Sequence, residues 1–340
     1  MKKLVSVIIP MYNVEKFIDR MMKCINNQIY TNLEIIIIND GSTDKSLEII
    51  KQYATKDNRI KIISTENKGV SNARNLGIEN SNGDYITFLD MDDYIEYDMY
   101  EKIINKIEET NAEVLRCNYV KEDEFGNVLL EGNLMELSNT VLYNKEIENK
   151  MLPNIFLDKL PTYMPLLTIK KDIIKDKLKF DTNIFMMEDL LFCLNLYRKI
   201  NNIYLFDYKC YHYVVNKNSI MKSRKNIMKN YYGTLKIIHI LEKFFSENKF
   251  DNMMYSNMYL TYSIMLIKYI LRTFQQDDEY RMNYNKLVEV LNTDDAISFI
   301  KKADFSMYNN EYIKKAAKYI QDNKFEDLYK FAIEIKKIEI

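Results

Sequence analysis

The chain has 340 residues, 47% hydrophobic and 29% charged, which is the balance of a globular protein with a sizeable core. Its 48 basic and 49 acidic residues give a net charge of -1, so no overall field favours a nucleic-acid partner. With only 2 histidines and 4 widely spaced cysteines, the sequence excludes a multi-histidine metal centre and suggests neither a zinc site nor a disulfide framework. We expect reduced thiols, and oxygen ligands for any bound metal ion.

Short apolar runs rich in β-branched residues predict strands that are buried on both faces. They lie at residues 5–9, 34–38, 60–63, 85–89 and 113–117. Apolar residues at helical spacing over 14–25 predict a helix after the first strand. A second such pattern over 47–54 predicts another, with Ser42 or Thr43 as its cap.

Strands that alternate with helices predict an α/β fold with a mostly parallel sheet, in which ligands bind at the carboxyl ends of the strands. Beyond about residue 220 only helical periodicity continues. We therefore predict a catalytic domain over residues 1–220 and a helical subdomain over residues 221–340.

The N-terminus enters the first strand without the apolar core and cleavage site of a secretory signal, so we expect a cytoplasmic protein. Residues 252–267 lack charge but contain many polar side chains, which favours a buried helix over a membrane span. Basic residues between 222 and 243 predict a solvated helical face. Peripheral contact of the C-terminal helices with the inner face of the plasma membrane is the alternative.

An aromatic ring and a carboxylate follow the first two predicted strands. Tyr12 can stack on a nucleobase, and Asp40 can accept the imide N–H that uracil and thymine offer. The alternative interpretation of residues 39–42 is a common turn before a helix cap.

Three carboxylates, Asp90, Asp92 and Asp93, follow the fourth predicted strand. Their mutual repulsion is costly without a cation, and Mg²⁺ or Mn²⁺ together with a ligand's phosphates would relieve it. An acidic helix N-terminus is the alternative.

Four motifs, in this order, resemble the family-two inverting glycosyltransferases. They are VSVIIPMYN at residues 5–13, NDGSTD at 39–44, NKGVSNARN at 67–75 and DMDD at 90–93. The resemblance is strong over about residues 1–120 and continues weakly to about residue 220. It implies the A-type glycosyltransferase fold, which is a single Rossmann-like unit.

The resemblance also implies roles for individual residues in binding a nucleoside-diphosphate sugar. Tyr12 would stack on the base, which Asp40 would hydrogen-bond, and Arg74 would lie near the nucleotide. Asp90 would contact ribose or metal, and Asp92 would ligate the metal. The other donor-site residues predicted from these motifs are Pro10, Asn13, Asn67 and Met91.

Members of this family take their general base from a later acidic pair, and Glu188-Asp189 resembles that pair, with Asp189 as the base. The chemistry agrees, because a sugar hydroxyl is a poor nucleophile and needs a carboxylate to take its proton. A single displacement inverts the configuration at the anomeric carbon. The alternative is that the pair merely complements a helix dipole.

A looser resemblance covers residues 211–222, the family segment that closes over the donor diphosphate. His212 would ligate the metal or touch phosphate, and Ser219 or Lys222 would donate to phosphate oxygens. The alternative for His212 is a packed structural residue between two tyrosines.

These observations favour a non-processive enzyme, because a chain with 0 Trp cannot hold the Gln-x-x-Arg-Trp motif of processive members. We predict an inverting transferase, dependent on Mn²⁺ or Mg²⁺, that moves one sugar from a UDP-linked or related donor. The sugar would go to a hydroxyl of a surface-glycan precursor of capsule, teichoic acid or lipid-linked oligosaccharide. The acceptor molecule would be a glycan, a lipid-linked molecule or a protein. The alternatives are a sugar nucleotidyltransferase and a non-catalytic assembly partner, and a homo-oligomer is left open.

Overall fold

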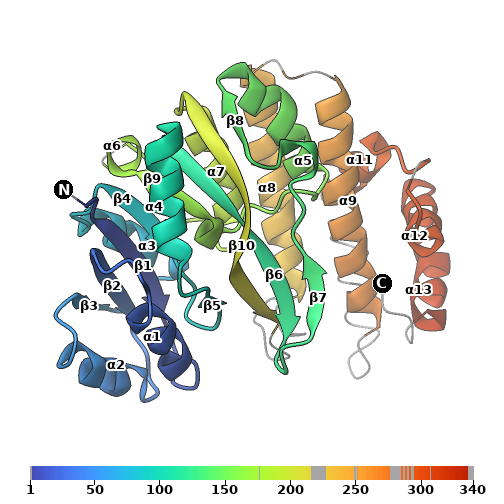
Figure 1. The fold of residues 1–340 in the computed structure, drawn as a ribbon. Helices are drawn as coiled ribbons and strands as arrows, with labels where there is room; N and C mark the ends of the chain where they lie inside the picture. The colour runs from blue at the N-terminus through green and yellow to red at the C-terminus, as the bar shows by residue number, and fades with distance from the viewer. Residues whose placement is uncertain are drawn as a thin grey trace. The chain divides into compact units, whose positions relative to one another are not determined.

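A computed structural model describes residues 2–175, 177–215, 227–248, 250, 252–275, 285, 288, 291, 295–306 and 308–335. The chain divides into two compact units. The first comprises Met1–Ile155 and Lys159–Asn216, and the second comprises Phe156–Asp158 and Lys217–Ile340. Figure 1 shows the course of the chain.

The first unit is built on one sheet in the order β3-β2-β1-β4-β9-β6-β10-β5, with β7 and β8 paired to β6 and β10. The pairs β3-β2, β2-β1, β1-β4 and β6-β10 are parallel, whereas β9 runs antiparallel between β4 and β6. The strands are β1 (Val5–Met11), β2 (Leu33–Asp40), β3 (Ile60–Thr65), β4 (Tyr85–Phe88), β5 (Tyr94–Ile95), β6 (Val114–Asp123), β7 (Val128–Glu131), β8 (Thr140–Tyr143), β9 (Leu167–Lys170) and β10 (Asn202–Val215). The predicted α/β fold is confirmed, with a sheet that becomes mixed beyond β4.

Helices cover both faces of this sheet. The helices are α1 (Ile18–Asn26), α2 (Ser46–Ala54), α3 (Val70–Glu79), α4 (Met99–Thr110), α5 (Leu152–Phe156), α6 (Lys171–Ile174) and α7 (Glu188–Tyr197). Apolar residues of α1, α2 and α4 pack with Val7 and Ile9 of β1, whereas Ala73 of α3 packs with Ile36 and Ile38 of β2. Since successive residues of a strand point to opposite faces, α3 covers the face opposite α1 and α4.

Two local predictions differ from the structure. The strand β3 lies at the edge of the sheet, so several of its side chains are exposed and it is not buried on both faces. The helix α2 begins at Ser46 rather than after a cap at Ser42 or Thr43, and Oδ1 of Asp44 accepts from the Ser46 N–H at 2.9 Å.

Helix α3 lies directly against the sheet at Gly77. A Cβ atom there would come within 2.3 Å of Cγ2 of Ile8, closer than side chains approach in folded proteins. Glycine therefore lets the helix backbone touch β1, and this contact sets the height of α3 above the sheet.

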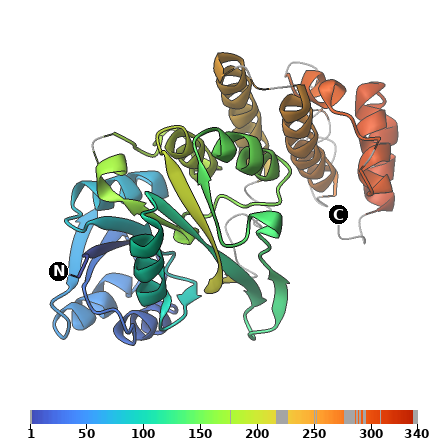
Figure 2. The same ribbon diagram turned by 45° about the horizontal axis from the view of Figure 1, so that its top comes forward.

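The second unit is helical. Its long helices α8 (Ile227–Asn248) and α9 (Asn252–Phe274) lie side by side in Figures 1 and 2 and bury Leu241, Phe245 and Leu266. The other helices described there are α11 (Ala296–Lys302), α12 (Glu311–Gln321) and α13 (Phe325–Glu334). Oδ1 of Asn310 accepts from the Ile313 N–H at 3.1 Å and so caps α12.

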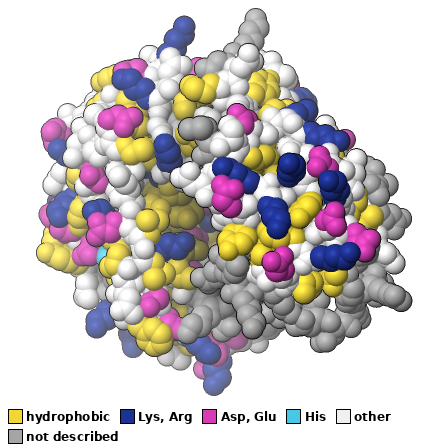
Figure 3. Space-filling model, turned by 90° about the vertical axis from the view of Figure 1, so that its right-hand side faces the viewer, with side chains coloured by type: hydrophobic (Ala, Val, Ile, Leu, Met, Phe, Trp, Pro, Cys, Tyr) yellow, Lys and Arg dark blue, Asp and Glu magenta, His cyan; other side chains and the backbone are white. Residues whose placement is uncertain are grey.

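Within the described residues, no helix combines the length and the apolarity that crossing a membrane requires. On α8, Lys236 and Lys243 are exposed. The face drawn in Figure 3 carries basic and acidic side chains intermixed. The 4 cysteines are free thiols, and Cys117, Cys193 and Cys210 are buried, as predicted.

Candidate active site

The loops that follow β1 and β2 are tied to each other at the carboxyl edge of the sheet. Asn13 has a left-handed backbone with φ 52°, and its Oδ1 accepts from the Thr43 N–H at 2.8 Å. In return, Oγ of Ser42 accepts from the Asn13 N–H at 3.2 Å. These bonds fix the loop around Tyr12, whose side chain stays 43% exposed and can meet a ligand ring.

Asp40, the last residue of β2, connects the strand to the start of α3. Its Oδ1 accepts from the Lys68 N–H at 2.8 Å and its Oδ2 accepts from the Gly69 N–H at 2.9 Å. Gly41 follows with φ +73°, where a Cβ would lie 2.8 Å from the backbone nitrogen of Asn67. Each carboxylate oxygen of Asp40 keeps a second lone pair, so hydrogen bonding to a base stays a prediction.

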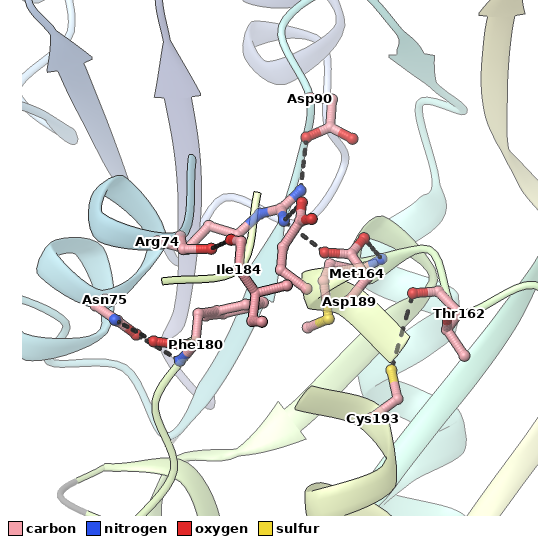
Figure 4. A network of polar contacts seen from close by, with 11 residues as sticks. Arg74, Asn75, Asp90, Thr162, Met164, Phe180, Ile184, Asp189 and Cys193 are labelled. Carbon is pink, nitrogen blue, oxygen red and sulfur yellow. Dashed lines mark hydrogen bonds and ion pairs between the residues drawn. The ribbon is translucent and has the colours of Figure 1, made fainter. Parts of the chain in front are cut away.

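Arg74 of α3 joins the two acidic motifs that the sequence placed far apart. Nη1 contacts Oδ1 of Asp189 at 2.6 Å and Oε1 of Glu188 at 3.3 Å, and Nη2 contacts Oδ1 of Asp90 at 3.3 Å. Figure 4 shows the guanidinium between Asp90 and Asp189. Its side chain is only 4% exposed, so these contacts are screened weakly by solvent.

Helix α3 also positions the start of α7. The side-chain amide of Asn75 donates to the Phe180 carbonyl at 2.8 Å and accepts from the Phe180 N–H at 2.8 Å (Figure 4). Met187, immediately before α7, has a left-handed backbone with φ 60°, an uncommon conformation for a residue with a long side chain. The paired bonds and this turn deliver Glu188 and Asp189 to Arg74.

Asp189 has the proton affinity of a base that works near neutral pH. Burial raises the pKa of its carboxyl group to about 7, against the opposing charge of Arg74 and together with the repulsion of Glu188 and Asp90. Its Oδ2 accepts from the Met164 N–H at 3.3 Å, which holds the side chain in place. A carboxylate near neutral pH is suited to accept a proton from a hydroxyl.

The acidic cluster (Asp90, Asp92 and Asp93) combines two half-buried carboxylates with one buried carboxylate. Asp93 is buried and accepts from the Val214 N–H at 2.8 Å and from the Tyr211 hydroxyl, so it anchors the cluster to β10. Burial raises the pKa of Asp92 and, more strongly, that of Asp93, and the charge of Asp90 adds to both. The carboxylate oxygens of this cluster repel one another when they are charged. They are hard ligands and are therefore suited to a divalent cation.

His212 lies in a separate cluster. Its Nδ1 is 2.9 Å from Oε1 of Glu122 and its Nε2 is 3.0 Å from Oε1 of Glu96, so carboxylates engage both ring nitrogens. The ring also stacks on Tyr94 at 4.2 Å. A metal ligand needs a free nitrogen, and this geometry gives the predicted metal role of His212 no support. Among the residues described, no group of three or more His, Cys, Asp or Glu side chains is arranged to hold a metal.

The other predicted site residues fall into two groups. Pro10 lies in β1 two residues beyond Ile8, where the pairing with β4 stops, and Met91, between Asp90 and Asp92 in the sequence, is buried. Asn67 lies exposed beside Gly41. Ser219 and Lys222 lie outside the described residues, and their phosphate contacts stay predictions.

Sequence reasoning missed Arg20 of α1 and Tyr163, and it gave no role of its own to Tyr213, which lies within the segment 211–222. Arg20 donates from Nη2 to the Asp92 carbonyl, and its guanidinium lies 5.5 Å from the ring centre of Tyr94. No motif marks Arg20 or Tyr163, because contacts between distant parts of the chain bring them to the site.

Comparison with known proteins identifies the family to which the chain is similar. Residues 6–166 match the family model of glycosyl transferase family 2. The uncharacterized glycosyltransferase EpsJ of Bacillus subtilis is 33% identical over 218 residues, 64% of this chain and 62% of that protein. The minor teichoic acid biosynthesis protein GgaB of the same organism is 31% identical over 335 residues, 92% of this chain and 35% of that protein. The matched segments thus span less than two thirds of either relative.

A solved structure shares the fold. The crystal structure of S. aureus TarS 1–349 in complex with UDP-GlcNAc aligns with a TM-score of 0.62 at 19% identity, covering 98% of this chain and 91% of that chain. The family match contains the ends of β1, β2 and β4 where Tyr12, Asp40 and the acidic cluster lie. The chain belongs to glycosyl transferase family 2.

Proposed function

We propose that this chain is an inverting glycosyltransferase that transfers one sugar from a UDP-linked donor to a hydroxyl group of a surface-glycan precursor. The observation that carries the proposal is the contact of one buried guanidinium, that of Arg74, with both Asp189 and Asp90. A proton acceptor and a diphosphate-facing acidic cluster thereby lie at one site, as a direct displacement at an anomeric carbon requires.

In the proposed reaction, Asp189 accepts the proton of the acceptor hydroxyl as its oxygen attacks the anomeric carbon. The new carbon–oxygen bond forms while the bond to the diphosphate oxygen breaks from the opposite side, and the electron pair leaves with UDP. One displacement of this kind inverts the anomeric configuration. Arg74 keeps Asp189 oriented and favours its ionised form, because a positive charge beside a carboxylate lowers its pKa.

The donor would bind along the ends of β1 and β2, with its base on Tyr12 and beside Asp40. The complex of TarS with UDP-GlcNAc supports a UDP-linked donor, and the similarity to GgaB, which is named for teichoic acid synthesis, supports a surface-glycan acceptor. Asp90 and Asp92 fit a hard divalent cation, Mn²⁺ or Mg²⁺, which would supply neutralisation of the departing diphosphate.

The proposal is tested by incubating the purified chain with UDP-, GDP- and dTDP-sugars, with and without Mn²⁺, and measuring nucleoside-diphosphate release. We expect release of UDP from at least one UDP-sugar, through slow transfer to water. Release of pyrophosphate from a sugar phosphate and a nucleoside triphosphate would instead mark a nucleotidyltransferase. Failure to bind or turn over any of these donors would contradict the proposal.

Replacing Tyr12 by alanine should weaken UDP binding by about 1–3 kcal/mol, the range for a base stacked on an aromatic side chain. Isothermal titration with UDP measures the effect. Tyr12→Phe, which keeps the ring, is the control and should bind UDP as the wild type does. Equal affinity of all three proteins would place the base elsewhere.

The Asp92→Ala variant should lose the part of UDP affinity that depends on Mn²⁺, because one of two hard oxygen ligands is removed. The dissociation constants for UDP measured with and without Mn²⁺ should differ for the wild type and should be equal for the variant. Asp84→Ala is the matched control, since Asp84 is an acidic residue at the start of β4, away from the acidic cluster. A variant that kept the full Mn²⁺ effect would remove Asp92 from the metal site.

A further inference from the structure

Two tyrosine rings form a stacked pair at the carboxyl edge of the sheet. The ring centres of Tyr163 and Tyr213 are 5.4 Å apart and their planes differ by 11°. Tyr119 supports Tyr163 edge-on, with ring centres 5.5 Å apart, and is itself buried. Tyr163 and Tyr213 are both partly exposed, so the pair borders the core without being enclosed by it.

The two tyrosines are attached to different parts of the site, one beside the predicted base Asp189 and one beside the acidic cluster. Tyr163 immediately precedes Met164, whose N–H donates to Oδ2 of Asp189 at 3.3 Å. Tyr213 immediately precedes Val214, whose N–H donates to Oδ1 of Asp93 at 2.8 Å. One ring is thus attached beside the base and the other beside the acidic cluster.

Partly exposed aromatic rings at this position are suited to bind a sugar ring. A pyranose ring is amphipathic, since its C–H groups form apolar faces and its hydroxyls form a polar rim. An aromatic surface binds such a face and leaves the hydroxyls free to react. Nζ of Lys121 lies 5.7 Å from the ring centre of Tyr213 and can donate to hydroxyls at the rim of a sugar resting there.

We propose that the Tyr163–Tyr213 pair is the platform on which a pyranose ring of the acceptor rests. The inference depends on the proposed function and deepens it by assigning the acceptor site. The acceptor hydroxyl must reach Asp189, and Tyr163 is covalently next to the residue that holds Asp189. The donor base is assigned to Tyr12 in the loop after β1, and this leaves the tyrosine pair for the acceptor.

The test is saturation-transfer NMR with the methyl glycosides of glucose, galactose and N-acetylglucosamine as probes, in the presence of UDP. Ring C–H protons of at least one glycoside should receive saturation from the wild-type protein. Tyr213→Leu, which keeps apolar bulk but removes the aromatic face, should lower that signal about tenfold, the scale of one aromatic contact. Tyr213→Phe should retain it.

Control variants distinguish a failure of this inference from misfolding of a variant and from a failure of the proposed function. Tyr143→Leu changes an exposed tyrosine opposite the start of β10, far along the strand from Tyr213, and should leave the signal unchanged. Tyr163→Leu serves if Tyr213→Leu does not fold, as judged by its thermal transition. UDP binding without any glycoside signal, or equal signals from wild type and the leucine variants, overturns the platform alone. If the wild-type protein does not bind UDP, that result overturns the proposed function instead.

Discussion

Asp189→Asn should lower the rate of sugar transfer by at least about a hundredfold while UDP affinity stays within a few-fold of wild type. A general base typically contributes about 10²–10⁴ in rate, and an amide of the same size cannot accept the proton. The fold should persist, because the pKa of Asp189 is higher in the folded chain than in an unfolded one. Ionising it as pH rises to about 7 therefore costs stability, and the neutral amide avoids that cost.

The pH dependence of the transfer rate provides a second test of Asp189 as the base. Since only the carboxylate form of Asp189 is active, the wild-type kcat/KM should rise with pH and level off above about pH 7. The residual activity of Asp189→Asn should lack this acidic limb. Transfer within a few-fold of wild type would show that Asp189 is not the base, and Glu188 would be tested next.

Arg74→Met should destabilise the protein by about 3 kcal/mol, at the lower end of the range for removing one partner of a buried ion pair. The loss leaves Asp90, Glu188 and Asp189 to repel one another without their shared cation. Urea unfolding at pH 8 measures the difference in free energy of unfolding. The destabilisation should shrink as pH falls towards about 7 and change little below it, because the variant's Asp189 has the higher pKa and is protonated first.

Arg59→Met is the matched control, because Arg59 pairs with Asp57 at 2.8 Å in a more exposed setting. A pair of that kind contributes about 1 kcal/mol or less. Equal effects of the two substitutions would show that the contacts of Arg74 are no stronger than a surface ion pair. In Arg74→Met the acidic limb of kcat/KM should also move to higher pH, since Arg74 lowers the pKa of Asp189.

Much of the first unit was predictable because its parallel strands are short and apolar. Residues 5–9 and 34–38 are long enough runs to identify β1 and β2, and alternation with helices then fixes which strand ends meet. That reasoning placed Tyr12 and Asp40 at one edge of the sheet, where the structure has them. Local pattern was sufficient wherever the site residue directly follows its strand.

The remainder of the site depends on contacts between distant parts of the chain. The antiparallel strand β9 (Leu167–Lys170) is too short to show a period, so the mixed part of the sheet was missed. The pairing of Asn75 with Phe180 spans 105 residues, and nothing local to either residue signals it. His212 was given a metal role by resemblance, but Glu96 and Glu122 reach it from other strands and loops.

The contact of Gly77 with Ile8 limits the substitutions that this protein can accept during evolution. Arg74 lies one helical turn before Gly77, so any residue that lifts the helix from β1 also moves the guanidinium away from Asp189. Substitutions among the aliphatic residues around Gly77 can be absorbed by repacking, but a methyl group at position 77 would come within 2.3 Å of the buried Ile8 side chain and push the helix from the sheet. Evolutionary drift should therefore be slow at Gly77, although this residue has no side chain with which to take part in the chemistry.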